Sequence, residues 1–260
     1  MLLDNIIADK ALEVKTIKEQ FKFITLKNIE EIFPPIKDFT SEISKPGKIN
    51  LIAELKKKSP SAGEIISNFK PAEIAKIYEE AGASAISLLT DWKYFEGILG
   101  YLKAVKQAVK LPILRKDFII DEIQIYESRM AGADAVLLIA RILDSSKLKQ
   151  FIELCDKIKL PALVEVHNEA ETEKALKAGA QIIGINNRDL DTLKVDFNIS
   201  LQIINKFPEL KNKILVSESG INSPSQIKEL KSAGFNAVLI GEALLKSPDI
   251  KEKTKELLSK

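Results

Sequence analysis

The sequence predicts an α/β protein, a (β/α)8 TIM barrel preceded by an N-terminal helical extension, on three observations. An Ala-Gly motif recurs along the chain, short β-rich runs recur with it, and the length of 260 residues is one at which such a barrel forms a single domain. We therefore expect one domain over residues 1–260, with the extension at 1–48 and the barrel at 49–260.

The Ala-Gly motif marks the ends of four expected helices. It occurs in EEAGASAISLL (79–89), RMAGADAVLLIA (129–140), LKAGAQIIGIN (176–186) and KSAGFNAVLIGE (231–242). Glycine enters the left-handed conformation of a helix C-cap without a Cβ clash. The expected caps are therefore Gly82, Gly132, Gly179 and Gly234. The apolar run that follows each of them is continuous, as in parallel strands that are covered on both faces.

Four further β-rich runs complete a set of eight expected strands. They lie at 49–56, 111–118, 160–167 and 212–219. Each of the eight precedes a helical pattern, and their starts are roughly 20 to 35 residues apart, as in successive βα units. The extension has helix-like segments near 2–20 and 28–33. A doubly wound open sheet is the alternative, but the chain lacks the GxGxxG turn that normally follows its first strand.

The composition excludes several classes of function. The net charge is +2, from 39 basic and 37 acidic residues, which argues against a nucleic-acid surface. A single cysteine and a single histidine exclude a disulfide framework and a Cys/His zinc site, so no metal is expected. The first residues do not resemble a signal peptide, and no apolar run reaches the roughly 18 residues of a membrane span. We expect a monomeric cytoplasmic protein that acts on a small molecule.

Charged residues gather at the ends of the expected strands, where barrel active sites form. Because side chains two apart share a face of a strand, those that point inward at this end are Glu54, Lys56, Lys116, Phe118, Arg141, Glu165, Asn186, Arg188 and Glu218. Buried ion pairs stabilise proteins only weakly. So many ionisable groups in one barrel mouth therefore indicate a functional site.

The loops after the seventh and eighth strands are typical of phosphate binding. They read SESGINSP (217–224) and IGEALLKSP (240–248), and barrels commonly bind phosphate at these two loops through backbone N–H groups. Gly220 and Gly241 would allow close backbone approach, and Ser219 can add a hydroxyl donor. We expect a phosphorylated small-molecule substrate.

Five segments together resemble the indole-3-glycerol phosphate synthase family. They are AELKKKSPS (53–61), LRKDFIID (114–121), LVEVHN (163–168), IGINNRDLDTLKVD (183–196) and VSESGI (216–221), and the match covers roughly residues 48–248. The resemblance implies a cofactor-free lyase of tryptophan biosynthesis. Its substrate, 1-(2-carboxyphenylamino)-1-deoxyribulose 5-phosphate, would lose carbon dioxide and water as the indole ring closes.

The resemblance also implies roles for particular residues. Lys116 would be the general acid of ring closure, and Glu165 would handle proton transfer in the dehydration. Lys56 and Glu54 would complete the catalytic set. The implied substrate contacts are Ser59, Phe95, Phe118, Asn186, Arg188 and Glu218, and the implied phosphate contacts are Ser219, Gly220, Gly241 and Glu242. Two departures, Ile98 in place of a serine and Ala62 in place of a basic residue, fall in loops.

The residue types agree with this chemistry. A phosphate and a carboxylate require cations, which Lys56, Lys116 and Arg188 supply, and neighbouring carboxylates should keep Lys116 protonated. Crowding among carboxylates should raise the pKa of the one that acts as an acid in the dehydration. His167 is expected to bond locally at its strand end.

Three rival functions stay open at this point. A sugar-phosphate isomerase of the same pathway would place a cysteine on the first strand and an aspartate on the sixth, where this chain has Glu54-Leu55-Lys56 and Asn186. A Schiff-base aldolase would require a neutral lysine. A phosphate-binding barrel without chemistry would bind the substrate but not convert it.

Overall fold

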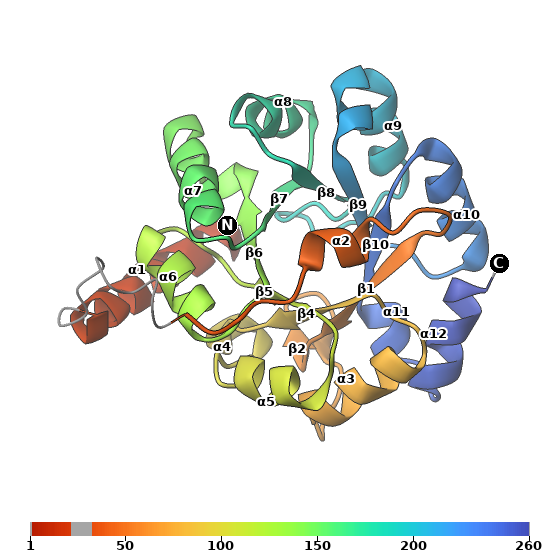
Figure 1. Cartoon of the computed structure of the whole chain (residues 1–260), viewed down its shortest axis with the longest axis horizontal. Helices are drawn as coiled ribbons and strands as arrows, with labels where there is room; N and C mark the ends of the chain where they lie inside the picture. The colour runs from red at the N-terminus through yellow and green to blue at the C-terminus, as the bar shows by residue number, and fades with distance from the viewer. Residues whose placement is uncertain (1, 22–32, 260) are drawn as a thin grey trace.

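The computed structural model describes residues 2–21 and 33–259 and contains a closed barrel of eight parallel strands (Figure 1). The strands neighbour each other in chain order around the barrel. They are β1 (Asn50–Leu55), β4 (Ala85–Leu89), β5 (Ile113–Lys116), β6 (Ala135–Ile139), β7 (Ala162–Val166), β8 (Ile182–Asn186), β9 (Ile214–Glu218) and β10 (Ala237–Ile240). Each lies within a run predicted from the sequence, so the fold prediction is confirmed.

Helices connect successive strands and form the outer layer. The longer ones are α3 (Pro71–Glu80), α5 (Tyr101–Ala108), α6 (Glu122–Met130), α7 (Ser145–Lys157), α8 (Glu169–Lys177), α9 (Asn198–Lys206), α10 (Pro224–Ala233) and α12 (Ile250–Leu258). Short elements are α4 (Trp92–Phe95), η2 (Ala140–Ile142), η3 (Pro208–Asn212) and α11 (Glu242–Leu245). The four predicted cap glycines all have positive φ, between +90° and +103°, and are confirmed as helix ends.

Alternation along each strand divides the apolar residues between two cores. On β1, Ile52 points into the barrel, while Leu51 and Leu55 pack against the helices. The inner core repeats this pattern with residues such as Leu114, Leu163 and Val216. Glu54, Lys116, Glu165 and Glu218 each lie two positions beyond one of these inner residues, so the strands aim them into the barrel interior at its carboxyl end.

The extension covers both ends of the barrel. Helix α2 (Phe39–Ile43) lies at the amino end, toward the viewer in Figure 1, where Phe39 and Ile43 are fully buried and the Ile43 carbonyl accepts a hydrogen bond of 3.1 Å from Asn50 Nδ2. Helix α1 (Leu2–Phe21) confirms the segment predicted near 2–20 and lies at the carboxyl end, where Leu3 and Ile6 contact the inner core.

Two expectations differ from the structure in detail. Most of the helical segment predicted near 28–33 lies outside the described residues, and Phe33 itself is not helical. A two-stranded antiparallel hairpin, β2 (Lys58–Ser59) with β3 (Gly63–Glu64), follows β1 and was not predicted. It is too short to produce a readable alternation pattern.

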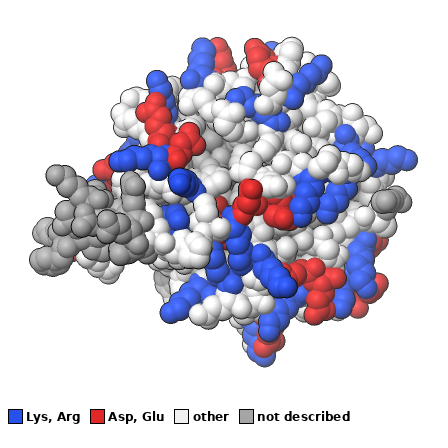
Figure 2. Space-filling model, viewed as in Figure 1, with Lys and Arg blue, Asp and Glu red and all other residues white. Residues whose placement is uncertain are grey.

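The surface that carries α2 mixes both signs of charge, and no single-sign patch covers it (Figure 2). Within the described part of the chain, no helix has both the length and the apolar content needed to cross a membrane.

Candidate active site

A cavity of about 610 Å³ opens at the carboxyl end of the barrel. It is lined by every residue that the sequence analysis assigned to catalysis, substrate binding or phosphate binding: Glu54, Lys56, Ser59, Phe95, Lys116, Phe118, Glu165, Asn186, Arg188, Glu218, Ser219, Gly220, Gly241 and Glu242. The structure thus brings these residues together in one compartment. Their individual roles remain predictions.

Lys116 lies at the centre of the charged part of the cavity. Its Nζ is 3.0 Å from Glu165 Oε2 and 2.7 Å from Glu218 Oε2. Burial by itself lowers the pKa of this ammonium group, but the carboxylates of Glu165, Glu218 and Glu54 outweigh burial and hold the pKa far above its usual value. Lys116 therefore carries its proton at neutral pH, as an acid must.

The two carboxylates on Lys116 differ in their proton affinity. Burial, together with repulsion from Glu165, raises the pKa of Glu218. For Glu165, burial also favours the neutral acid, but Lys116 and His167 outweigh it and lower the pKa. The expectation that crowding would raise the pKa of the carboxyl that handles the dehydration is therefore wrong for Glu165. The group with the raised pKa is Glu218, because it contacts one cation where Glu165 contacts two.

Two glycines make room for the carboxylates. A Cβ on Gly184 would lie 2.2 Å from Glu218 Oε1, and a Cβ on Gly241 would lie 2.3 Å from Glu54 Oε1. The Glu54 carboxylate thus occupies the space beside Gly241. Its Oε1 also lies 2.5 Å from Lys56 Nζ. The phosphate contact predicted for Gly241 stays a prediction, because the close approach that the structure shows at this glycine is that of a carboxylate.

Gly184→Ala is expected to lower kcat about 10²-fold, because the added methyl group displaces the Glu218 carboxylate from Lys116. Steady-state kinetics measures the effect. Gly100→Ala is the matched control, since a Cβ there meets nothing within 4 Å, and it should leave kcat unchanged. Equal kcat values for the two variants would show that the position of Glu218 does not matter.

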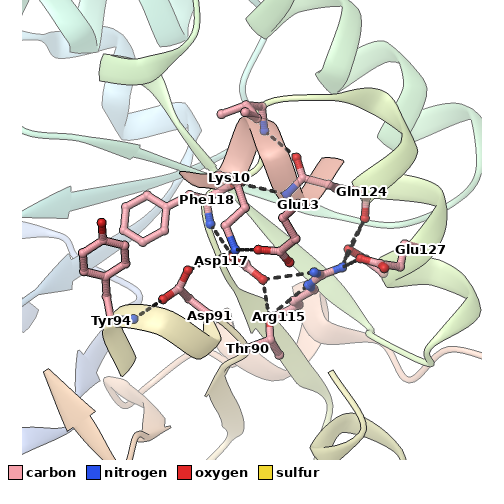
Figure 3. A network of polar contacts seen from close by, with 12 residues as sticks. Lys10, Glu13, Thr90, Asp91, Tyr94, Arg115, Asp117, Phe118, Gln124 and Glu127 are labelled. Atoms are coloured by element: carbon pink, nitrogen blue, oxygen red, sulfur yellow. Dashed lines mark hydrogen bonds and ion pairs between the residues drawn. The ribbon is translucent and has the colours of Figure 1, made fainter. Parts of the chain in front are cut away.

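A buried network of charges supports the residues on either side of Lys116 (Figure 3). Lys10 of α1 is 1% exposed, and its Nζ lies 3.0 Å from Asp91 Oδ2 and 2.9 Å from Asp117 Oδ1. Asp117 also pairs with Arg115 at 3.0 Å and accepts a hydrogen bond from the hydroxyl of Thr90. The network joins the extension to the ends of β4 and β5.

The same network positions the apolar wall of the cavity. Asp117 accepts a hydrogen bond of 2.8 Å from the Phe118 N–H, and Asp91 caps the helix that ends at Phe95. The two phenylalanine rings lie 6.2 Å apart, and Leu3 and Ile6 of α1 line the cavity as well. Sequence reasoning missed Lys10 and Asp117, because the pair that they form joins residues far apart in the chain.

The opposite side of the cavity is built from the loop after β9 and the start of α11. Ser219 and Gly220 both have positive φ, +66° and +76°, and Asn187 Nδ2 donates to the Ser219 carbonyl at 3.0 Å. Two consecutive residues of this loop are therefore in the left-handed backbone conformation, and the hydrogen bond from Asn187 holds the loop in place. Lys246, whose Nζ lies 2.6 Å from Glu242 Oε1, adds a cation to this side that was not predicted.

Arg141 does not join the site. Strand β6 ends at Ile139, and the chain continues as the 3-10 helix η2, so the alternation used to place Arg141 no longer applies. Its guanidinium pairs with Asp191 in the loop after β8. Arg141 is not among the residues that line the cavity, so the prediction that it points inward is wrong. Among residues 2–21 and 33–259, no cluster of His, Cys, Asp or Glu is arranged to hold a metal ion.

Comparison with known proteins identifies relatives over nearly the whole chain. The family model described as indole-3-glycerol phosphate synthase matches residues 3–257. The chain is 50% identical to an indole-3-glycerol phosphate synthase of Endomicrobium trichonymphae, covering 99% of both chains. It is 48% identical to one of Caldanaerobacter subterraneus subsp. tengcongensis, again covering 99% of both.

Solved structures with low sequence identity share the fold. A thiamine phosphate pyrophosphorylase from Pyrococcus furiosus is similar with a TM-score of 0.59 and 16% identity, covering 80% of this chain and 93% of its own. An N-acetylmannosamine-6-phosphate 2-epimerase from Clostridium perfringens is similar with a TM-score of 0.58 and 17% identity, covering 75% of this chain and 87% of its own. At these identities the likeness supports the barrel alone.

Proposed function

The chain belongs to the indole-3-glycerol phosphate synthase family, and from this premise we propose how its residues carry out the reaction. The enzyme is a carboxy-lyase of tryptophan biosynthesis that acts on a phosphorylated small molecule. The proposed roles rest mainly on one observation. The protonated Lys116 lies between the buried carboxylates of Glu165 and Glu218, in a cavity that has an apolar wall on one side.

The cavity accounts for both ends of the substrate. The carboxyphenyl ring packs against Phe95 and Phe118, and the apolar residues of α1 close over it. The phosphate binds at Ser219 and Gly220 and at the backbone N–H groups of Glu242 and Ala243, the first two residues of α11. This orientation places the ribulose carbonyl near Lys116, since the two ends of the cavity lie on either side of it.

Ring closure needs an acid, and Lys116 supplies it. As the ring carbon that bears the carboxylate attacks the ribulose carbonyl, the carbonyl oxygen takes a proton from the Lys116 ammonium group and becomes a hydroxyl. The attack leaves a tetrahedral ring carbon and an iminium group. The bond to the carboxylate then breaks, and its electron pair restores the aromatic ring and neutralises the iminium. The protein's own groups suffice for these steps.

Dehydration needs both an acid and a base. The hydroxyl takes a second proton to leave as water, and the neighbouring carbon loses one proton to give the indole. Glu165, held ionised, is the acceptor for that carbon-bound proton, and Glu218, whose pKa is raised, can hold a proton for the departing hydroxyl. Two protons enter and one leaves, so each turnover consumes one proton from solvent.

The remaining polar residues bind and orient the substrate. Lys56 and Arg188 provide cations for its carboxylate, and Asn186 and Ser59 provide polar contacts. Glu54 holds Lys56 in place. Glu242 pairs with Lys246 and lies 3.6 Å from Arg188, which links the phosphate side of the cavity to the carboxylate side. The monomeric state and the cytoplasmic location are further parts of the proposal.

Turnover of the pure protein tests the proposed function. Incubation with 1-(2-carboxyphenylamino)-1-deoxyribulose 5-phosphate should produce the fluorescence of an indole. Borohydride added during turnover should label no lysine, because a protonated Lys116 cannot form the Schiff base of an aldolase. Binding without fluorescence would favour a phosphate-binding barrel without chemistry, and labelling of Lys116 would favour an aldolase.

A further inference from the structure

We propose that His167 is a positioning residue for the reaction: backed by Glu171, its imidazolium holds the Glu165 carboxylate ionised and in place opposite Lys116. The inference rests on the proposed role of Glu165. It concerns a buried histidine that lies outside the cavity lining, and His167 itself need not touch the substrate.

His167 lies between two carboxylates at the end of β7. Its Nδ1 is 2.9 Å from Glu171 Oε2, and its Nε2 is 3.2 Å from Glu165 Oε1. The second contact is an ion-pair distance without hydrogen-bond alignment, because within residues 2–21 and 33–259 Nε2 has no partner that satisfies hydrogen-bond geometry. A polar ring nitrogen buried in this way, beside a carboxylate oxygen, is most stable when it carries a proton and a charge.

Glu171 is fixed by bonds that do not involve the imidazole. It is the third residue of α8; its backbone N–H donates to the side chain of Asn168, and its Oε1 accepts from Asn168 Nδ2 at 2.8 Å. Its Oε2 also accepts a hydrogen bond of 2.8 Å from the backbone N–H of His167. The start of α8 therefore presents a carboxylate of fixed orientation to Nδ1, which sets the plane of the imidazole ring.

Glu165 is consequently held from two sides. Oε2 contacts the ammonium group of Lys116 at 3.0 Å, and Oε1 faces His167. Among the described residues, Lys116 is the cation that pairs with Glu218, and Glu165 beside it repels a negative charge. This asymmetry gives a physical reason why the proton shared within the carboxylate pair resides on Glu218. Glu165 is left as the base.

Among the described residues, the charged groups that act on the imidazole are the two carboxylates, and Lys116 lies beyond Glu165. From α8, Lys174 is directed instead to the carbonyls of Ala140 and Leu143. From η2, Arg141 pairs with Asp191. On β8 the nearest polar side chain of the site, Asn186, is neutral. Burial lowers the pKa of His167, but Glu165 and Glu171 outweigh it and raise the pKa to about 9.

The arrangement predicts how activity depends on pH. A histidine with a raised pKa is charged below that value and loses its charge as pH rises through it. In the wild-type enzyme, kcat should therefore fall in two steps: first near pH 7, as Glu218 loses the proton that it holds for the departing hydroxyl, and again above pH about 9, as Glu165 loses the support of one cation. In Glu171→Gln the second of these steps should move to lower pH, and in His167→Gln the second step should be absent while the first remains.

The chain has one histidine, so NMR titration of the imidazole is unambiguous and does not require turnover. We expect titration near pH 9 in the wild-type protein, and at lower pH in both Glu165→Gln and Glu171→Gln. Glu169→Gln is the matched control, since Glu169 lies in the same turn of α8 but is exposed and pairs with Lys206. It should leave the titration unchanged.

Kinetics completes the test. His167→Gln should lower kcat about tenfold at neutral pH with little change in KM, because more of the proton shared by the carboxylate pair then resides on Glu165, which leaves less ionised base while the cavity wall is unaltered. An imidazole pKa that is the same in wild type and Glu165→Gln would overturn the inference, whatever the enzyme's activity. A second alkaline step near pH 9 that is retained in His167→Gln would overturn it as well. A coupled titration in a protein without turnover would instead count against the proposed function.

Discussion

Lys116→Met is expected to lower kcat by about 10³- to 10⁴-fold, since it removes the acid that protonates the carbonyl during ring closure. Lys116 is the cation that Glu165 and Glu218 share, at 3.0 Å and 2.7 Å. Without it, both carboxylates face an apolar side chain, and their pKa values rise. More of Glu165 is then protonated at neutral pH, so the base of the dehydration is lost together with the acid of ring closure. Single-turnover measurements with saturating substrate would separate this loss from a loss of binding.

Lys106→Met is the matched control for the loss of a buried ion pair. The Lys106 side chain is 18% exposed and that of Lys116 14%, and Lys106 pairs with the fully buried Asp134 near the amino end of the barrel. We expect Lys106→Met to lower thermal stability and to leave kcat within about twofold of wild type, because it does not touch the cavity. If both variants lost activity equally, Lys116 would be a structural residue and not the acid.

Glu165→Gln is expected to lower kcat by about 10²- to 10³-fold, because the amide cannot accept the proton lost in the dehydration. The substitution keeps the size of the side chain and its position on β7, so KM should change little. Because dehydration follows decarboxylation, carbon dioxide release in a single turnover should be faster than formation of the fluorescent indole. Monitoring both products in one experiment measures this difference.

Glu127→Gln provides the comparison for Glu165→Gln. Glu127 pairs with Arg115 at 2.8 Å on the outer side of β5, and its side chain is 13% exposed. The same chemical change there should leave both product rates unchanged. Carbon dioxide and indole that appear together, at a reduced rate, in Glu165→Gln would place Glu165 in ring closure and not in the dehydration.

Much of the fold and the outline of the site could be predicted from the sequence, because both follow from local patterns. Alternation with a period of two assigned Glu54, Lys116, Glu165 and Glu218 to the inner face of their strands. Parallel strands in one barrel then bring those ends to one opening. The same rule gave a wrong position for Arg141, since it holds only while the strand continues, and β6 stops at Ile139.

The tertiary structure alone decided how the charges at that opening interact. The sequence indicated that carboxylates would crowd Lys116, but it did not show that His167 faces Glu165 or that Gly184 makes room for Glu218. Nor did it reveal that Lys10 reaches Asp117 from the extension. Proton affinities depend on burial and on distances of a few ångströms between residues that are far apart in the chain. The sequence by itself therefore determined which groups meet in the barrel mouth, and only the packing of the folded chain decided which of them hold protons.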